Sequence, residues 1–255
     1  MPSGAVYQLN TKGTQDRFLT GNPQHNFIKQ VYRRHTNFSS EKVKLYPSNE
    51  ANFGKQFDVT IPRKGDFLHK CWFHFKLPLL TPTSGTYAGW TNSVGHALID
   101  KVEITIGGYK IDEHYGLFLE IWNELTERPA FNTGEFLMTG KYNHLKSLQE
   151  NAERESTYAV PLQFWFCKNI GSALPLIALQ FHTIVLSFYL RPFSECVIYD
   201  GVTEPTSVNM SDVHVLSEFL YVEDEERIKL VNSTNQYLIT QVQSINGETV
   251  NLLNG

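Results

Sequence analysis

Hydrophobic and polar residues alternate along much of the chain with a period of two, the spacing that turns one face of a β-strand toward a core. The clearest run is 67–77, in which every second residue from Phe67 to Leu77 is apolar or readily buried. Similar patterns predict further strands at 55–61, 98–106, 158–166, 182–190 and 213–222. The runs 182–190 and 213–222 are apolar on both faces, which favours strands in the middle of a two-layer core.

Turn and helix signals organise these strands. Gly107-Gly108 separates two strand patterns and predicts a two-residue hairpin, because both positions of such a turn need positive φ. A helix is predicted where Phe118, Ile121, Trp122 and Leu125 recur at helical spacing before Pro129. The stretch 130–155 is typical of a long polar loop that can include a short helix, and 225–232 of a short charged helix.

The pattern as a whole predicts an all-β fold. It contains eight or nine strands, no regular alternation of strands with helices, and no internal repeat. We therefore expect an eight-stranded jelly-roll β-sandwich with long loops and one or two short helices. Residues 1–40 lack a sustained period and form an extended N-terminal arm, residues 41–224 form the sandwich, and residues 225–255 add a helix and a further strand at 236–243.

Composition narrows the range of functions. The chain has 255 residues with 22 Lys+Arg and 26 Asp+Glu, a net charge of −4, which excludes a generally basic nucleic-acid coat. Aromatic residues make up 13% and charged residues only 19%, so a large core and a partly covered surface are expected. The three cysteines, Cys71, Cys167 and Cys196, cannot form a disulfide framework, and the two that lie inside apolar, strand-like runs are predicted to be buried free thiols.

Neither a targeting segment nor a membrane span is predicted. The first twenty residues lack a basic start followed by an apolar stretch, as a signal peptide would require. The most apolar window, 170–190, is interrupted by Pro175, Gln180 and His182, so it does not meet the length of about 20 apolar residues that spanning requires.

Enzyme motifs are absent from the sequence. It contains no phosphate-binding glycine loop, no G-x-S-x-G and no H-E-x-x-H. A cupin-like metal site is disfavoured because His69 and His74, five residues apart on one strand, point to opposite faces. We therefore predict a protein that is not an enzyme and has no cofactor. Among its N-x-[ST] sequons, Asn209 and Asn232 are candidate glycosylation sites.

A cationic cluster lies near the end of the arm, where Lys29, Arg33, Arg34 and His35 are interleaved with aromatic and aliphatic residues. Such a cluster suits a nucleic-acid or acidic membrane surface, but it is short. The favoured interpretation is that the guanidinium groups of this cluster pair with carboxylates at a contact with another protein.

Three long blocks of sequence resemble the major capsid proteins of nucleocytoplasmic large DNA viruses, the iridovirus, phycodnavirus and mimivirus-like group. The first is TQDRFLTGNPQ at 14–24 with VYRRHTNF at 31–38, which resembles the family's amino-terminal arm. The second, PLQFWFCKN at 161–169 with ALPLIALQ at 173–180, resembles a segment late in its first jelly roll. The third runs from Glu225-Glu226-Arg227 to QYLITQVQ at 236–243 and resembles the linker helix and the opening strand of its second jelly roll.

The resemblance implies a structural virion protein with two jelly rolls per chain. It implies a homotrimer that forms a pseudo-hexagonal capsomer, neighbouring capsomers that tile an icosahedral shell, and assembly in the host cytoplasm. It also implies minor capsid proteins beneath the shell and an internal membrane that is near but not spanned, with no direct nucleic-acid contact. The predicted assembly contacts at the capsomer base are Lys29, Arg33, Arg34, His35, Asn37 and Phe38.

Two alternatives remain open at this stage. The chain stops at Gly255, about where a second jelly roll would begin, so it is either a fragment or a single-jelly-roll minor or vertex (penton) capsid protein. The strand predicted at 236–243 opens a domain that does not follow, which favours the fragment. A carbohydrate-binding jelly roll is the other alternative, with Tyr87 and Trp90 as its only plausible aromatic platform.

Overall fold

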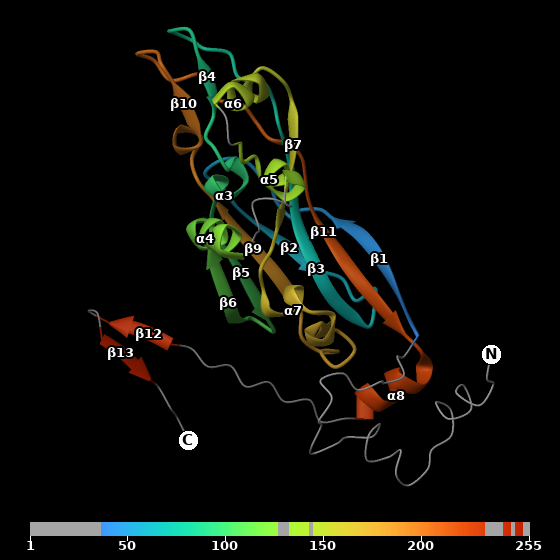
Figure 1. The fold of residues 1–255 in the computed structure, drawn as a ribbon. Helices are drawn as coiled ribbons and strands as arrows, with labels where there is room; N and C mark the ends of the chain where they lie inside the picture. The colour runs from blue at the N-terminus through green and yellow to red at the C-terminus, as the bar shows by residue number, and fades with distance from the viewer. Residues whose placement is uncertain (1–36, 127–132, 143–144, 233–241, 246–247, 252–255) are drawn as a thin grey trace, which may run out of the picture. The chain divides into compact units, whose positions relative to one another are not determined.

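The computed structural model describes residues 37–126, 133–142, 145–232, 242–245 and 248–251. Within that part of the chain, two antiparallel sheets face each other (Figure 1). The first sheet has the order β1-β11-β3-β7, comprising β1 (Phe38–Leu45), β11 (Ser211–Val222), β3 (Phe67–Leu77) and β7 (Ser156–Pro161), with β8 (Leu174–Pro175) paired to β3. The second has the order β2-β9-β5-β6, comprising β2 (Gln56–Ile61), β9 (Ile184–Leu190), β5 (Ile99–Ile106) and β6 (Tyr109–Tyr115).

The pairing of these eight strands is nested. β1 pairs with β11, β2 with β9, β3 with β7 and β5 with β6, always antiparallel. Strands from the beginning of the chain therefore lie beside strands from its end, as in a long hairpin rolled into two sheets, which is the jelly-roll topology. The predicted fold class is confirmed, and the two runs apolar on both faces are β9 and β11, which lie inside their sheets.

Aromatic residues from both sheets fill the space between them. The rings of Phe73 on β3 and Phe188 on β9 lie 4.9 Å apart, and Phe57 on β2 stacks on Phe188 at 5.0 Å. All three are fully buried. The alternation predicted for 67–77 holds from His69 to Leu77, where it places the aromatic face of β3 on this core, whereas at the start of the strand Leu68 is buried and Phe67 is half-buried.

The hairpin between β5 and β6 forms as predicted. Gly107 and Gly108 have φ values of 61° and 85°, the left-handed region that a side chain at either position would disfavour. The Gly107 amide also donates to the Thr183 carbonyl at 2.9 Å. The hairpin is thus joined to the loop that precedes β9.

The prediction of one or two short helices is wrong. The described residues contain α3 (Val94–Leu98), α4 (Gly116–Thr126), α5 (Thr133–Thr139), α6 (Leu145–Ala152), α7 (Trp165–Lys168) and α8 (Asp224–Asn232), and the 3₁₀ turns η1 (Ile170–Ser172) and η2 (Phe193–Glu195). Two of them, α5 and α6, occupy the predicted polar loop at 130–155. Both are only seven or eight residues long, and α5 packs on β7, so tertiary contacts stabilise helices whose own sequence signal is weak.

The predicted strand at 158–166 is also too long. β7 ends at Pro161, and Phe164 and Phe166 lie in and beside α7, both fully buried. Phe164 stacks on His114 of β6 at 4.8 Å. An apolar run of this length is compatible with a strand or a buried turn of helix, and here the second half of the run covers the end of the other sheet.

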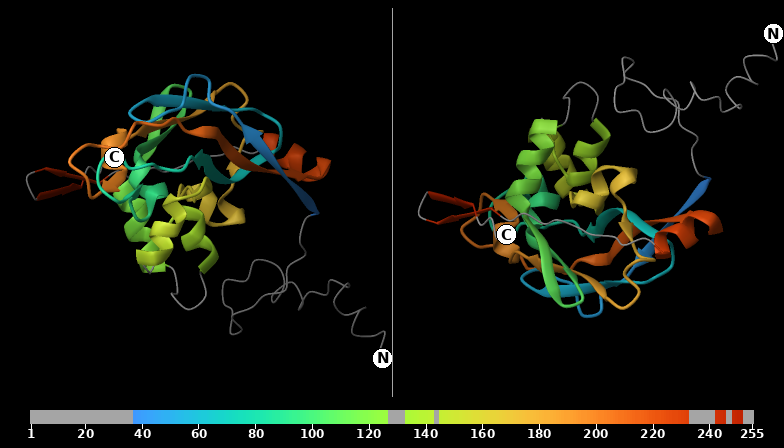
Figure 2. Two further views of the ribbon diagram at one scale, coloured as in Figure 1. Left: turned by 90° about the horizontal axis from the view of Figure 1, so that it is seen from above. Right: turned by 90° about the horizontal axis from the view of Figure 1, so that it is seen from below.

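The loops gather at the two ends of the sandwich. The segment after β3 forms β4 (Ala88–Trp90), which pairs with β10 (Val197–Tyr199), so that two loops distant in sequence are joined at one end (Figure 1). The crossover from β6 to β7 carries α4, α5 and α6, which cluster on one side of the strands (Figure 2). α7 and the β5–β6 turn lie toward the other end.

The segments that flank the predicted sandwich, before β1 and after β11, are described only in part. β1 begins at Phe38, because residues 38–40 of the predicted arm pair with 220–222 of β11. The predicted charged helix is α8, and its Arg227 binds the buried carboxylate of Asp66, with Nε 3.0 Å from Oδ1. Most of the strand predicted at 236–243 lies outside the described residues. β12 (Val242–Ile245) and β13 (Glu248–Asn251) form a separate antiparallel pair.

Cys71, Cys167 and Cys196 are all free and buried, which confirms the prediction for the two cysteines in strand-like runs. Burial raises the pKa of the Cys196 thiol to about 12, which leaves it protonated and unreactive at neutral pH. Within the described residues, no helix combines the length and apolar character needed to cross a membrane.

Candidate functional site

Most of the predicted assembly contacts fall outside the structure's described range. Lys29, Arg33, Arg34 and His35 lie in residues 1–36, so their role stays a prediction. Asn37 is exposed, and Phe38 starts β1 with 57% of its surface exposed. Phe38 is thus accessible to a partner, and its proposed contact is likewise untested.

The largest unexpected surface belongs to α4. The helix forms where the sequence predicts it, but the side chains that it buries are Gly116, Leu119 and Asn123. Its larger apolar side chains face solvent: Leu117, Phe118, Ile121 and Leu125 are 66%, 37%, 49% and 79% exposed. We call these four residues the α4 apolar face. α5 adds two more exposed apolar side chains, Leu137 and Met138.

Close backbone contact determines the orientation of α4. A Cβ at Gly116 would overlap the carbonyl oxygens of Ile99 and His96, so only glycine lets the helix start against the α3–β5 junction. Further along, Lys168 of α7 lies over the Trp122 ring at 4.2 Å. The start of α4 at Gly116 and the side that carries Trp122 are therefore held against neighbouring elements, whereas the α4 apolar face points to solvent.

A charged cluster holds the next turn of α4. The Glu120 carboxylate accepts hydrogen bonds from the Lys141 ammonium at 2.8 Å, the Ser93 hydroxyl at 3.1 Å and the ring of His96. Lys141 also pairs with Glu124. Burial alone would raise the pKa of Glu120, but hydrogen bonds from His96 and Lys141 outweigh burial and lower it to about 2. This cluster joins α4, α3 and the segment after α5.

The Glu120 cluster predicts acid sensitivity. The pKa of Glu120 is lower in the folded protein than the ordinary 4.5, so its contribution to stability is present above pH 4.5 and is lost as pH falls toward 2. Replacing Glu120 with Gln is expected to lower the free energy of unfolding by about 1–3 kcal/mol at pH 7, because Lys141 and His96 lose an anionic acceptor.

Urea unfolding at several pH values checks this. The difference between wild type and the Glu120→Gln variant should shrink between pH 4.5 and 2. Glu124→Gln is the matched control, since Glu124 is 59% exposed and pairs with the same lysine, and its effect should stay below about 1 kcal/mol. A constant difference between wild type and Glu120→Gln across that range would contradict the assignment.

The proposed aromatic platform for carbohydrate does not exist. Trp90 is only 2% exposed, and its indole lies against Phe53 at 5.8 Å and Phe193 at 5.9 Å. Its Nε1 donates to the Pro78 carbonyl, and Tyr87 packs over Gly89. The tryptophan belongs to the core because the β4–β10 pair folds it inward, so it cannot stack on a sugar.

Asp200 joins the two loops that carry β4 and β10. Its carboxylate accepts from the backbone amides of Thr86 and Tyr87 and from the Thr86 hydroxyl at 2.6 Å. These hydrogen bonds lower the pKa of Asp200. On either side of Asp200 in the chain, Val202 is fully exposed and Ile198 is half exposed. The loop at 78–97 is thus held by the loop before β11.

The histidines of the described ranges do not come together in a metal-binding group. His69 is buried with Nδ1 2.9 Å from the Phe166 carbonyl oxygen, whereas His74 stacks on His214 at 5.0 Å. The two therefore occupy different surroundings, as their spacing predicts. Across the described ranges, no group of three metal-ligating side chains comes together.

Both candidate glycosylation sites are exposed. The Asn209 side-chain oxygen accepts from Asn52 Nδ2 at 2.6 Å, and Asn232 ends α8. Nothing in the structure shows a modification, so glycosylation stays a prediction for both.

The composition of α4 contained a signal for its unusual orientation. Gly116, Glu120 and Asn123 fall at spacings of four and three, so they form one small and polar stripe on the helix. Such a stripe is normally the solvent face. Only the partners Lys141 and His96, which are distant in sequence, show that it is the buried one.

Comparison with known proteins gives a consistent result. A family model described as "Major capsid protein N-terminus" matches residues 26–248. The chain is 33% identical to the major capsid protein of Phaeocystis pouchetii virus over 97% of this chain and 54% of the relative. It is 37% identical to that of Pyramimonas orientalis virus over 96% of this chain and 60% of the relative.

A solved structure agrees in fold. A chain of the PBCV-1 virus capsid superposes with a TM-score of 0.71 and 29% identity, covering 86% of this chain and 50% of that one. The present chain therefore spans between half and 60% of the length of the proteins it matches.

Proposed function

We propose a structural role for this chain, which belongs to the major capsid protein family of large DNA viruses. In this role the chain is a subunit of an icosahedral virus shell. Proteins of this family are structural components of the virion and not enzymes. In the proposed arrangement three copies form a pseudo-hexagonal capsomer, and capsomers tile the shell.

The observation that carries the proposal is the α4 apolar face. An exposed row of Leu117, Phe118, Ile121 and Leu125 on a helix anchored by its polar side is unusual for a protein that works alone. Interface centres are rich in aliphatic and aromatic side chains and poor in charge. The α4 apolar face therefore suits contact with another copy of the chain.

Other parts of the proposal rest on sequence resemblance. The arm residues Lys29, Arg33, Arg34, His35, Asn37 and Phe38 are proposed to contact minor capsid proteins beneath the shell. An internal membrane would lie nearby without being spanned, and assembly would take place in the host cytoplasm. The net charge of −4 supports the absence of direct nucleic-acid binding.

The solution mass tests the proposal. Light scattering after gel filtration should give about three times the chain mass of 29.2 kDa, with a mass that falls on dilution. A pentamer would favour the alternative of a single-jelly-roll vertex protein. A monomer at all concentrations would contradict the idea that the α4 apolar face joins copies of this chain.

A further inference from the structure

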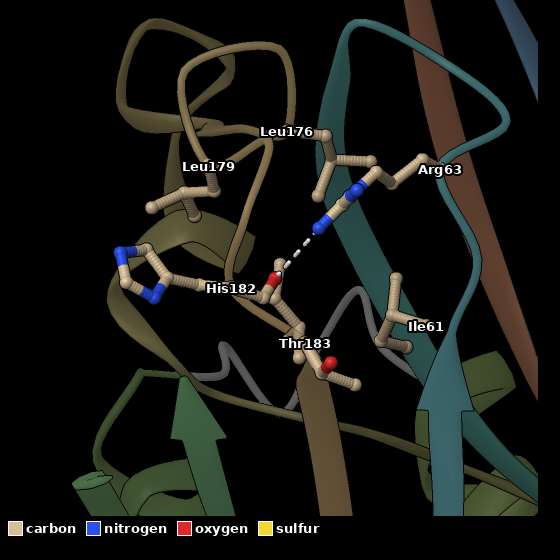
Figure 3. Close-up of a pocket in the computed structure, with 7 residues that line it drawn as sticks. Ile61, Arg63, Leu176, Leu179, His182 and Thr183 are labelled. Carbon is tan, nitrogen blue, oxygen red and sulfur yellow. Dashed lines mark hydrogen bonds between the residues drawn. The ribbon is translucent and has the colours of Figure 1, made fainter. Parts of the chain in front are cut away.

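A pocket lies where β2 ends and β9 begins, at the end of the sandwich that holds the β5–β6 turn (Figure 3). Its volume is about 360 Å³. The floor is apolar and buried, formed by Ile61, Leu176 and Ile184, which are 4%, 2% and 3% exposed. The rim is polar and exposed, with Arg63, His182 and Thr183 around the opening.

The wall on the side of β9 is held by the neighbouring hairpin. The Gly107 amide donates to the Thr183 carbonyl at 2.9 Å. A Cβ at Gly107 would come within 2.7 Å of His182 Nδ1, so the absence of a side chain there lets the imidazole pack against the turn. The rim of the pocket is thus supported from outside.

Arg63 is the notable side chain of the pocket. Figure 3 shows its guanidinium entering between Leu176 and Ile61 and reaching the carbonyl oxygen of His182. That hydrogen bond is long, 3.3 Å, and uses one of the five N–H donors of the guanidinium. Four donors therefore have no protein acceptor in the described structure.

The absence of a carboxylate at Arg63 contrasts with two other arginines, Arg191 and Arg227. Arg191 pairs with Asp100, and Arg227 with Asp66. Within the part of the chain that the structure describes, Arg63 has no such ion pair. A planar guanidinium with unused donors beside an apolar floor is a site for a carboxylate that carries an apolar group.

The size and surroundings of the pocket favour a polypeptide as the source of that carboxylate. Small-molecule pockets occupy about 300–1,000 Å³, and this one is at the lower limit, enough for one or two side chains. Phe181, 92% exposed, lies in the same loop as Leu179 and His182. A peptide with several side chains can use both the pocket and this ring.

We propose that this pocket binds a segment of a different protein, not a second copy of this chain, in which an Asp or Glu is adjacent to an aliphatic side chain. The carboxylate would accept a bidentate pair of hydrogen bonds from Arg63, and the aliphatic side chain would rest on Ile61, Leu176 and Ile184. The interface is separate from the α4 apolar face and does not depend on trimer formation.

Fluorescence anisotropy with the full chain tests the proposal. The probe is a short fluorescein-labelled peptide with two glutamates flanking a leucine, and the matched probe carries glutamines in their place. The acidic peptide is expected to bind at least about tenfold more tightly than the neutral one, because charge-assisted hydrogen bonds contribute more than neutral ones. Equal binding of both peptides, or no binding of either at millimolar protein, would overturn the proposal.

Variants locate the site. Arg63→Gln is expected to weaken the acidic peptide about tenfold or more, and Leu179→Asp to weaken both peptides. Lys70→Gln removes the same charge from an exposed position on β3 and should change neither. Arg63 and Leu179 are not buried, so both variants should fold, and circular dichroism of each confirms it.

Two other occupants would be recognised by the same experiments. If oleate bound in an Arg63-dependent manner while the peptide did not, the pocket would be a lipid site and the proposal would fail. If Arg63→Gln instead reduced the solution mass of the chain, a second copy would be the occupant, which also contradicts the proposal.

Discussion

Replacing Ile121 and Leu125 of α4 together by glutamate is expected to convert the proposed trimer of this chain to monomer. Both side chains are exposed, 49% and 79%, so the substitutions should change the free energy of unfolding of the monomer by less than about 1 kcal/mol. In an assembled interface the same carboxylates would be buried without partners, which is strongly unfavourable. The association constant should fall by about a hundredfold or more.

Analytical ultracentrifugation over a concentration series measures this change, and urea unfolding of the same samples reports on the fold. Val202→Glu is the matched control, because Val202 is fully exposed but lies on the loop that follows β10. It should leave association unchanged. An unaltered trimer in the double variant would show that α4 faces something other than a second copy.

Replacing Phe73 by alanine is expected to destabilise the jelly roll by about 3–5 kcal/mol. The ring is fully buried and lies 5.0 Å from that of Phe75 and 4.9 Å from that of Phe188, so it joins the two sheets. Its loss removes apolar contacts and leaves a cavity that the sheets cannot close without moving. A loss of that size is comparable to the whole stability of many domains.

Denaturant unfolding compares this variant with Phe181→Ala. Phe181 is 92% exposed, so its removal should change the free energy of unfolding by no more than about 0.5 kcal/mol. Phe73→Leu keeps most of the volume and should fall between the two. A cost below about 1 kcal/mol for Phe73→Ala would mean that the ring does not hold the sheets together as described.

The elements predicted with most success are those whose signal is local. The alternation at 67–77 gives β3 because, from His69 to Leu77, each buried residue lies two positions from the next, and this period belongs to a strand wherever the strand is placed. Gly107-Gly108 gives a tight turn because both residues adopt positive φ readily. The arm motif and the blocks at 161–180 and 225–243 pointed to the capsid family without any structure.

The failures occurred where a local pattern has two physical solutions. The apolar run 158–166 became half strand and half helix, because β7 ends at Pro161 and the following aromatic residues cover the end of the other sheet. Trp90 resembled a surface platform in a Gly/Ser/Thr-rich loop, yet pairing of β4 with β10 encloses it. In both cases the deciding partner lies far away in the chain.

The order of hydrophobic and polar residues was therefore sufficient for the class of fold, the main strands, the buried thiols and the family. Tertiary structure alone decided which face of α4 is buried, since Glu120 becomes a half-buried anchor only when Lys141 and His96 surround it. It also decided that Arg63 lies in a pocket, because Ile61 and Ile184 become neighbours only through the pairing of β2 with β9. Strand period and turn conformation depend on neighbouring residues, whereas burial of a charge and the shape of a surface depend on which distant segments the fold brings together.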